Sequence, residues 1–144
     1  MDAWVSAMDN LAATYQILGK YKEAEKLDIQ ILDGRNRILG VEHPDTISAM
    51  ENLATTYQIL GRYTEAEKLE MQVLDGSHRI LGEEHPDTIH AMGNLAVTYG
   101  CLKKYTEAER LEILILNART RILGAEHPQI ILAMENLAAT LRCL

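Results

Sequence analysis

Three histidines in equivalent sequence strings are the first candidates for chemistry in this chain. They are His43, His85 and His127, each between a glutamate and a proline, and they stand 42 residues apart. Imidazole ligands bind Zn²⁺ through bonds of about 2 Å, so several ligands must converge on one point. Histidines separated by a whole repeat cannot converge in this way. We therefore interpret them as helix caps or as partners of the preceding turn, and we predict no metal site.

Other constellations that could carry out a reaction are missing from the sequence. It contains no glycine-rich phosphate loop, no nucleophile elbow and no cysteine and histidine set at metal spacing. Cys101 and Cys143 are one period apart. Equivalent positions on stacked helices lie about 9 Å or more apart, beyond the ~7 Å limit for a disulfide. We predict free thiols, no cofactor and no enzymatic activity.

The charge balance excludes two classes of partner. The chain has 14 Lys and Arg against 21 Asp and Glu, and its pI is about 5.2. This acidic balance opposes binding to nucleic acid or to anionic membrane surfaces. No apolar run approaches the ~20 residues of a membrane span, and the first residues lack the features of a signal peptide. We expect a soluble, cytoplasmic protein with no nucleic-acid or membrane partner.

A 42-residue repeat organises the whole chain. The offset that relates the three histidines also relates tyrosines, cysteines and asparagines, the last at Asn10, Asn52, Asn94 and Asn136. A fixed period of this length indicates an α-solenoid or a similar array. The methionines at one repeat position, Met8, Met50, Met92 and Met134, are interpreted as core residues.

Each repeat is predicted to fold as two helices. In the central repeat, apolar residues recur at steps of three and four from Ile47 to Leu60, and Pro44 suits the first position of this A helix. Gly61 then supplies a helix stop. Thr64 to Glu67 match a capping box for the following B helix. Its apolar face is expected to run through Ala66, Leu69, Val73, Leu74, Ile80 and Leu81.

The B helix contains one feature that opposes continuity. Asp33-Gly34 and Asp75-Gly76 are turn-forming dipeptides in mid-segment, whereas the third repeat has Asn117-Ala118 there. We predict a continuous but locally weakened helix, with a kink as the alternative. In the third repeat, Lys103 replaces the glycine of the A–B turn, so this turn is expected to be strained or to have a slightly different conformation. Glutamate-rich stretches such as residues 65–70 are interpreted as solvated faces.

These patterns predict an all-α chain of seven helices: three antiparallel A–B hairpins and a final A helix. The expected repeats cover residues 1–42, 43–84 and 85–126, with a half repeat at 127–144, in one solenoid over 1–144. The ends look like those of a segment from a longer array. Apolar residues at the C-terminal end, Leu137, Leu141 and Leu144, are expected to promote end-to-end homo-oligomers.

The central repeat resembles the tetratricopeptide pattern, through Met50, Asn52, Leu53, Ala54, Tyr57, Gly61, Tyr63 and Ala66 at their separations. The period exceeds the usual 34 residues by eight, about two helical turns. This longer repeat resembles the kinesin light chain class and the arrays of fungal NLR-type receptors, and the similarity between the first two repeats is closer to the fungal arrays. The resemblance implies a right-handed superhelical α-solenoid. In place of the usual mid-helix aromatic, the B helices carry Asp28, Glu70 and Glu112.

The resemblance also implies a concave groove lined by the A helices, where a segment of another protein would bind. The candidate residues carried over from the pattern are Asp9, Asn10, Ser48, Glu51, Asn52, Thr55, Gln58, His90, Asn94, Val97 and Asn136. Several groove positions vary among the repeats, as a reader of different side chains would require, although drift at exposed positions gives the same pattern. The groove lacks a cluster of Lys and Arg, and its acidic residues favour a neutral or basic segment over an acidic one.

The asparagine row allows two hypotheses. An amide side chain can donate to and accept from a peptide backbone, so the row could clamp the main chain of a partner. Alternatively, each asparagine bonds a neighbouring helix and maintains the repeat spacing. For the chain as a whole, we favour a non-enzymatic protein-interaction scaffold, which could be the sensor end of a larger receptor. The alternative is a structural array that self-assembles through its open ends.

Overall fold

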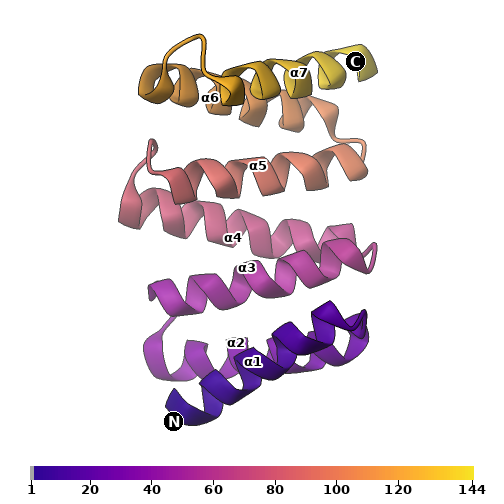
Figure 1. The fold of residues 1–144 in the computed structure, drawn as a ribbon, viewed down its shortest axis with the longest axis vertical. Coiled ribbons are helices and arrows are strands. Elements are labelled where there is room, and N and C mark those ends of the chain that lie inside the picture. Colours follow the sequence, from indigo (N-terminus) through magenta and orange to yellow (C-terminus); the bar gives the residue numbers. More distant parts are fainter. Residues whose placement is uncertain (1) are drawn as a thin grey trace. The chain divides into compact units, whose positions relative to one another are not determined.

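The computed structural model describes residues 2–144, and Met1 lies outside the described residues. Over this range the chain is helical and contains no strand (Figure 1). The all-α fold and the seven predicted helices are confirmed. The helices are α1 (Asp2–Ile17), α2 (Tyr21–Leu39), α3 (Pro44–Ile59), α4 (Tyr63–Leu81), α5 (Pro86–Cys101), α6 (Tyr105–Leu123) and α7 (Pro128–Cys143).

The chain divides into two compact units, Met1–Val73 and Leu74–Leu144. Unit 1 contains α1, α2, α3 and the first part of α4. Unit 2 contains the rest of α4 and the helices α5, α6 and α7. A single solenoid over 1–144 stays a prediction.

The histidines of the repeated string cap the A helices. The Nδ1 atom of His43 accepts a hydrogen bond from the backbone N–H of Asp45 at 3.1 Å, and each of the other two histidines accepts the equivalent bond. The proline that follows each histidine occupies the start of the helix, where a missing N–H costs nothing. The interpretation of these histidines as helix caps is therefore confirmed.

The predicted capping box at Thr64 to Glu67 is wrong. The helix α4 begins at Tyr63, so Thr64 lies inside its first turn. The residues at the N-cap of α2 and α6 are Lys20 and Lys104, and neither makes a side-chain cap bond. The backbone N–H of each lysine instead bonds back to the preceding A helix, as Lys20 does to the Tyr15 carbonyl at 2.8 Å. This bond closes a Schellman-type turn, and the next helix starts directly after it.

Glycine stands in these A–B turns because the turn requires a left-handed residue. Gly19 and Gly61 have φ values of 76° and 77°, and Lys103 has a φ value of 61° at the same position of the third repeat. A residue with a Cβ atom pays a steric cost in this region. The predicted strain in the third turn is thus present in the backbone.

The helices α2 and α4 are continuous through their mid-segment glycines, as predicted, and neither is interrupted there. Gly34, Gly76 and Ala118 are all buried at this register. A small residue is therefore required for packing at this point, and the turn-forming character of the Asp-Gly pair is overridden. The predicted apolar face is wrong at its C-terminal end, because Ile80 and Leu81 are exposed.

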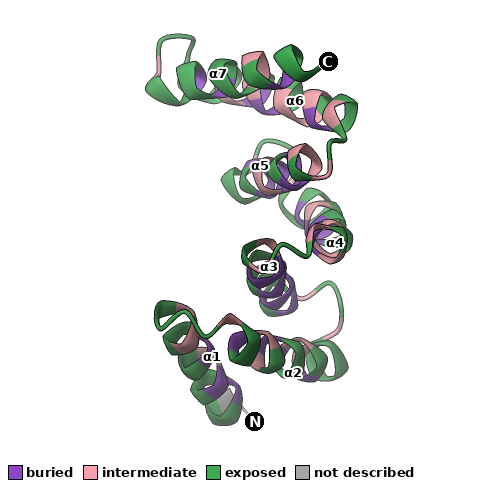
Figure 2. Cartoon of the chain, turned by 90° about the vertical axis from the view of Figure 1, so that its right-hand side faces the viewer, coloured by how far each residue is buried: buried purple, intermediate pink, exposed green. Residues whose placement is uncertain are grey.

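Buried residues lie along the facing sides of neighbouring helices within each unit (Figure 2). The core of unit 1 joins Met8 of α1 to Ile31 of α2, and that of unit 2 joins Met92 of α5 to Ile115 of α6. Met50 is buried as expected. Met134 is not, since it is 51% exposed on α7, and the expectation of a core role is wrong for this residue.

Candidate functional site

A polar cavity of about 310 Å³ opens in unit 1 between the A helices α1 and α3. Three predicted groove residues, Asp9, Ser48 and Asn52, line it together. The remaining lining residues are Ala12, Ala13, Gln16, Asp28, Arg35 and Asp45. Unit 1 thus brings part of the predicted groove to one concave surface.

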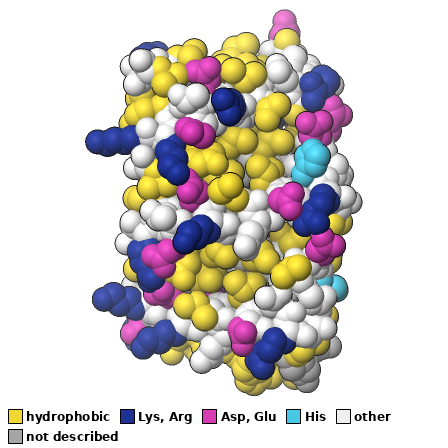
Figure 3. Space-filling model, turned by 180° about the vertical axis from the view of Figure 1, so that it is seen from behind, with side chains coloured by type: hydrophobic (Ala, Val, Ile, Leu, Met, Phe, Trp, Pro, Cys, Tyr) yellow, Lys and Arg dark blue, Asp and Glu magenta, His cyan; other side chains and the backbone are white. Residues whose placement is uncertain are grey.

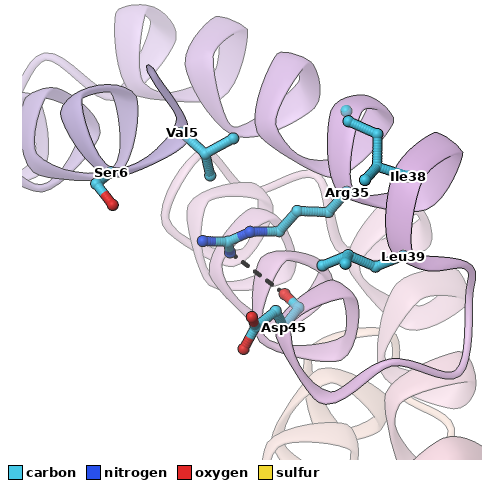
Figure 4. A pocket seen from close by; sticks show the side chains of 7 residues that line it. Val5, Ser6, Arg35, Ile38, Leu39 and Asp45 are labelled. Carbon is cyan, nitrogen blue, oxygen red and sulfur yellow. Dashed lines mark hydrogen bonds between the residues drawn. The ribbon is translucent and has the colours of Figure 1, made fainter. Parts of the chain in front are cut away.

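An ion pair crosses this cavity and employs one of the predicted site residues. Arg35 Nη2 lies 2.5 Å from Asp9 Oδ2, and the two side chains are only 16% and 32% exposed. Arg35 also donates to the backbone carbonyl of Asp45 at 3.3 Å (Figure 4). Charge-assisted bonds of this kind are stronger than neutral ones. Asp9 therefore holds α1 against α2 in addition to lining the cavity.

A buried carboxylate also lines the cavity. Asp28 is 3% exposed and accepts a hydrogen bond from the Thr56 hydroxyl at 2.8 Å. Gln16 in turn donates to Thr56 Oγ1 at 3.1 Å. Burial raises the pKa of Asp28 above its usual range, because desolvation disfavours the charged form, although the bond from Thr56 opposes the shift.

The carboxylates at the repeat position of Asp28 in the other B helices are Glu70, which is buried, and Glu112, which is half-buried. Glu70 is 5% exposed and accepts from Gln58 at 2.8 Å, so the interpretation of residues 65–70 as a solvated face is wrong for Glu70. Glu112 accepts from the Thr140 hydroxyl at 2.6 Å, while its other oxygen, Oε2, is buried without a hydrogen-bond partner. Burial likewise raises the pKa of Glu112. These acids replace the aromatic residue of the family pattern with polar contacts between helices.

The asparagine row is exposed at three of its four positions. Asn10, Asn52 and Asn136 are exposed, and Asn94 is half-buried. Asn10 and Asn52 accept hydrogen bonds from threonines of the next turn through their backbone carbonyls. Within residues 2–144, the side-chain amides of Asn10, Asn52 and Asn136 have no hydrogen-bond partner.

The other predicted site residues differ in their availability. Thr55 is exposed and bonds the backbone carbonyl of Glu51 at 3.0 Å, and Val97 is 61% exposed on α5. Gln58 is half-buried and bonded to Glu70. His90 is exposed and lines a different cavity, in unit 2.

A second cavity in unit 1 is lined by residues at the same repeat positions. The unit 1 cavity, of about 140 Å³, includes Val5, Ser6, Arg35, Ile38, Leu39 and Asp45 (Figure 4). The unit 2 cavity, of about 230 Å³, includes Ile89, His90, Arg119, Ile122, Leu123 and Gln129, which stand two repeats further along the chain. The groove positions carried over from the family pattern lay on A helices alone and therefore missed both B-helix arginines. Their signal was the recurrence of arginine at one B-helix position.

Within residues 2–144, no group of three His, Cys, Asp or Glu side chains is arranged to hold a metal ion. Cys101 and Cys143 are exposed free thiols. None of the described helices is both long enough and apolar enough to span a membrane. On the face drawn in Figure 3, basic and acidic side chains are interspersed with exposed hydrophobic ones.

Comparisons with known proteins agree with this architecture. The tetratricopeptide repeat family model matches residues 4–77 and 53–113. The nearly identical TPR-like repeats of a protein described as a kinesin light chain from Podosopora anserina superpose with a TM-score of 0.86 at 27% identity. That match covers 99% of this chain and 68% of the other.

A second solved structure shows the same fold at lower identity. BtubC (BKLC) from P. vanneervenii has a TM-score of 0.87 at 19% identity, over 99% of this chain and 57% of its own. No curated protein matches the chain in sequence. Because the family model covers most of the sequence and the helices match solved tetratricopeptide solenoids, the chain belongs to the tetratricopeptide repeat family, whose repeats generally mediate protein–protein interaction.

Proposed function

We propose that this chain is a non-enzymatic scaffold that binds a segment of another protein along the exposed stripe of its A helices. The observation that carries the proposal is the polar cavity of unit 1, where Ser48 and Asn52 of α3 face the same space as Asp9 and Gln16 of α1. A concave surface with a few convergent polar groups is the usual form of a binding site. The family membership supplies the class of ligand, a protein segment.

The exposed asparagines support a backbone clamp. Side-chain amides that are exposed and have no partner within the chain, as at Asn52 and Asn10, are available to donate to a carbonyl and to accept from an N–H of a bound segment. The alternative, in which these amides bond a neighbouring helix, has no such contact to support it at Asn52.

The charge around the unit 1 cavity favours a neutral or basic segment there. Asp9, Asp28 and Asp45 line it, and the single cation, Arg35, is already paired with Asp9. Such charges influence the association rate and the choice of partner more than the affinity. The cytoplasm remains the predicted compartment, because exposed thiols persist under reducing conditions.

A peptide display selection against the whole chain tests the proposal. Ser48→Arg places a bulky cation in the cavity and is expected to weaken selected peptides at least about tenfold, whereas Gln30→Arg on the exposed side of α2 is the matched control. Asn52→Ala separates the two asparagine hypotheses. Lost binding with unchanged melting supports the clamp, and earlier melting supports the structural role. If no peptide is selected, or if both arginine variants bind equally well, the proposal fails.

Self-association is the second candidate function. The helix α7 exposes Ile131, Leu132 and Leu141, and Leu144 directly after it is also exposed, each side chain at least half exposed. Exposed apolar patches of this kind often mark interaction surfaces. Light scattering over a concentration series distinguishes the two functions: a molar mass that rises with concentration supports an assembling array, and a constant monomer opposes it.

A further inference from the structure

The charge environment of one arginine distinguishes unit 2 from unit 1. Arg35 and Arg119 occupy the same repeat position, on α2 and α6. Arg35 is neutralised by Asp9 at 2.5 Å. The position of Asp9 in the repeat is taken by Gly93 in unit 2, so no carboxylate stands there.

Arg119 accordingly has no partner of its own. Within residues 2–144 it makes no hydrogen bond or ion pair, although its side chain is half-buried and lines the 230 Å³ cavity. The position of Asp45 is also neutral in unit 2, where Gln129 replaces it. No residue that lines this cavity carries a carboxylate. A partly desolvated guanidinium without a counter-charge is a strong site for a carboxylate, which it can bind through two parallel bonds.

The rest of the cavity defines the remainder of the ligand. Ile89, Ile122 and Leu123 provide an apolar wall, and His90 and Gln129 add polar groups at its edge. Two A helices, α5 and α7, begin beside the cavity, which Pro86 and Gln129 of their first turns line, and the positive end of a helix dipole favours an anion. Its volume is below the ~300–1,000 Å³ of typical small-molecule sites, so side chains fit it better than a metabolite.

We infer that the Arg119 cavity of unit 2 binds an aspartate or glutamate side chain, next to an aliphatic residue, of a segment from another protein. The inference rests on the proposed scaffold function and adds the chemistry of one subsite. It differs from the preference at the unit 1 cavity, where the arginine is already paired. The guanidinium would hold the carboxylate, and the isoleucine and leucine wall would cover the aliphatic neighbour.

Capped peptide arrays test this subsite with the whole chain. N-acetylated and C-amidated nonapeptides carry a central Leu-Glu, Leu-Gln or Leu-Lys pair in randomised neutral flanks, and a second set carries a free C-terminus. Preferential retention on Leu-Glu peptides is expected. Preference for free C-termini over internal glutamate, or equal retention on Leu-Gln peptides, overturns the inference.

Three variants assign the effect to Arg119. Arg119→Met retains an apolar stem and is expected to weaken the best Leu-Glu peptide at least about tenfold, measured by fluorescence anisotropy. Gly93→Asp supplies the missing counter-charge and is expected to have a similar effect with Arg119 still present, whereas the uncharged Gly93→Asn is the control. A Cβ atom at Gly93 meets no heavy atom within 4 Å, so the position is open to a side chain.

A direct readout covers the case in which a variant perturbs folding. In the unmodified chain, the Nε–H resonance of Arg119 is expected to shift on addition of the Leu-Glu peptide and to stay in place with the Leu-Gln peptide. Peptides that bind without moving this resonance, and with the same affinity for Arg119→Met, sink the inference and leave the scaffold function intact. If no peptide of any class binds, the scaffold function fails as well.

Discussion

The cavities around Arg35 and Arg119 share one repeat position and differ in charge. In unit 1 the guanidinium is bonded to Asp9 and to the Asp45 carbonyl. In unit 2 the corresponding positions hold Gly93 and Gln129, and within residues 2–144 the guanidinium has no partner. The repeat therefore reproduces the backbone and the arginine, while a substitution on the facing helix decides whether this arginine stabilises the fold or is available to a ligand.

The largest expected effect comes from removing Arg35, and the removal of Arg119 provides the contrast. Arg35→Met leaves the carboxylate of Asp9 half-buried and unpaired, and we expect a loss of about 1–3 kcal/mol in the free energy of unfolding. Arg119→Met breaks no bond and places an apolar chain beside Ile122, so its effect is expected to stay within about 0.5 kcal/mol. Urea unfolding measures both. Equal losses for the two variants would show that Arg119 has a structural partner and would remove the contrast.

A smaller effect is expected at Glu112, a half-buried acid of unit 2. The pKa of Glu112 is raised by burial, so the native state binds the proton more tightly than the unfolded chain does. The stability contributed by this group therefore falls as the pH rises from the unfolded pKa through the raised native value, and it stays low at neutral pH. Glu112→Gln is expected to stabilise the chain by about 1 kcal/mol at pH 7 and to have less effect in acid.

Thermal unfolding between pH 4 and pH 8 checks this expectation, with the exposed Glu126→Gln as the control. Burial also raises the pKa of Asp28 in unit 1. The same measurement on Asp28→Asn tests whether its replacement has the same pH-dependent effect on stability. A destabilised Glu112→Gln at neutral pH would indicate that the ionised carboxylate is a required partner of Thr140.

Substitutions in the A–B turns are expected to change the free energy of unfolding by about 1 kcal/mol in opposite directions. Lys103→Gly relieves a left-handed residue at φ 61° in unit 2 and is expected to stabilise the chain by up to about 1 kcal/mol. Gly61→Ala introduces the same strain in unit 1 and should destabilise it by a similar amount. No heavy atom lies within 4 Å of a Cβ built at Gly61, so the loss arises from φ alone. Melting temperatures that change in the same direction for both variants would contradict this account.

The smallest stabilising effect is expected at Gly93, the repeat equivalent of Asp9. Gly93 lies inside α5, and its Cβ position is open. Gly93→Ala is therefore expected to stabilise the helix by about 0.5–1 kcal/mol, the usual difference in propensity. Circular dichroism melting measures it. A destabilised alanine variant would mean that a close backbone approach, rather than an open pocket, requires glycine there.

The elements that were predicted correctly depend on local signals. Proline after histidine predicted the start of α3, α5 and α7, and Gly61 predicted the end of α3, because both residue types act through the backbone of their own turn. The capping box predicted at Thr64 was wrong, although it also rested on a local signal. The Schellman-type bond between the Arg62 N–H and the Tyr57 carbonyl determines where the next helix begins, and a four-residue motif does not show this.

The candidate site was predictable only in part. The spacing placed Ser48 and Asn52 on one stripe of an A helix, and unit 1 brings both to its polar cavity with Asp9. The burial of Glu70 and the role of the B-helix arginines were missed. Each depends on a contact with a residue of another helix, as Glu70 does on Gln58. From sequence alone, a charged residue is expected to be exposed to solvent.

The amino-acid sequence by itself determined the repeat, the seven helices and the family, because a 42-residue period and helical spacing are properties of the chain alone. Only the tertiary structure decided which charges are satisfied. Asp9 and Arg35 are 26 residues apart, and so are Gly93 and Arg119. Packing of an A helix against its B helix brings each pair of positions together, and the local charge balance then differs between two repeats with the same fold.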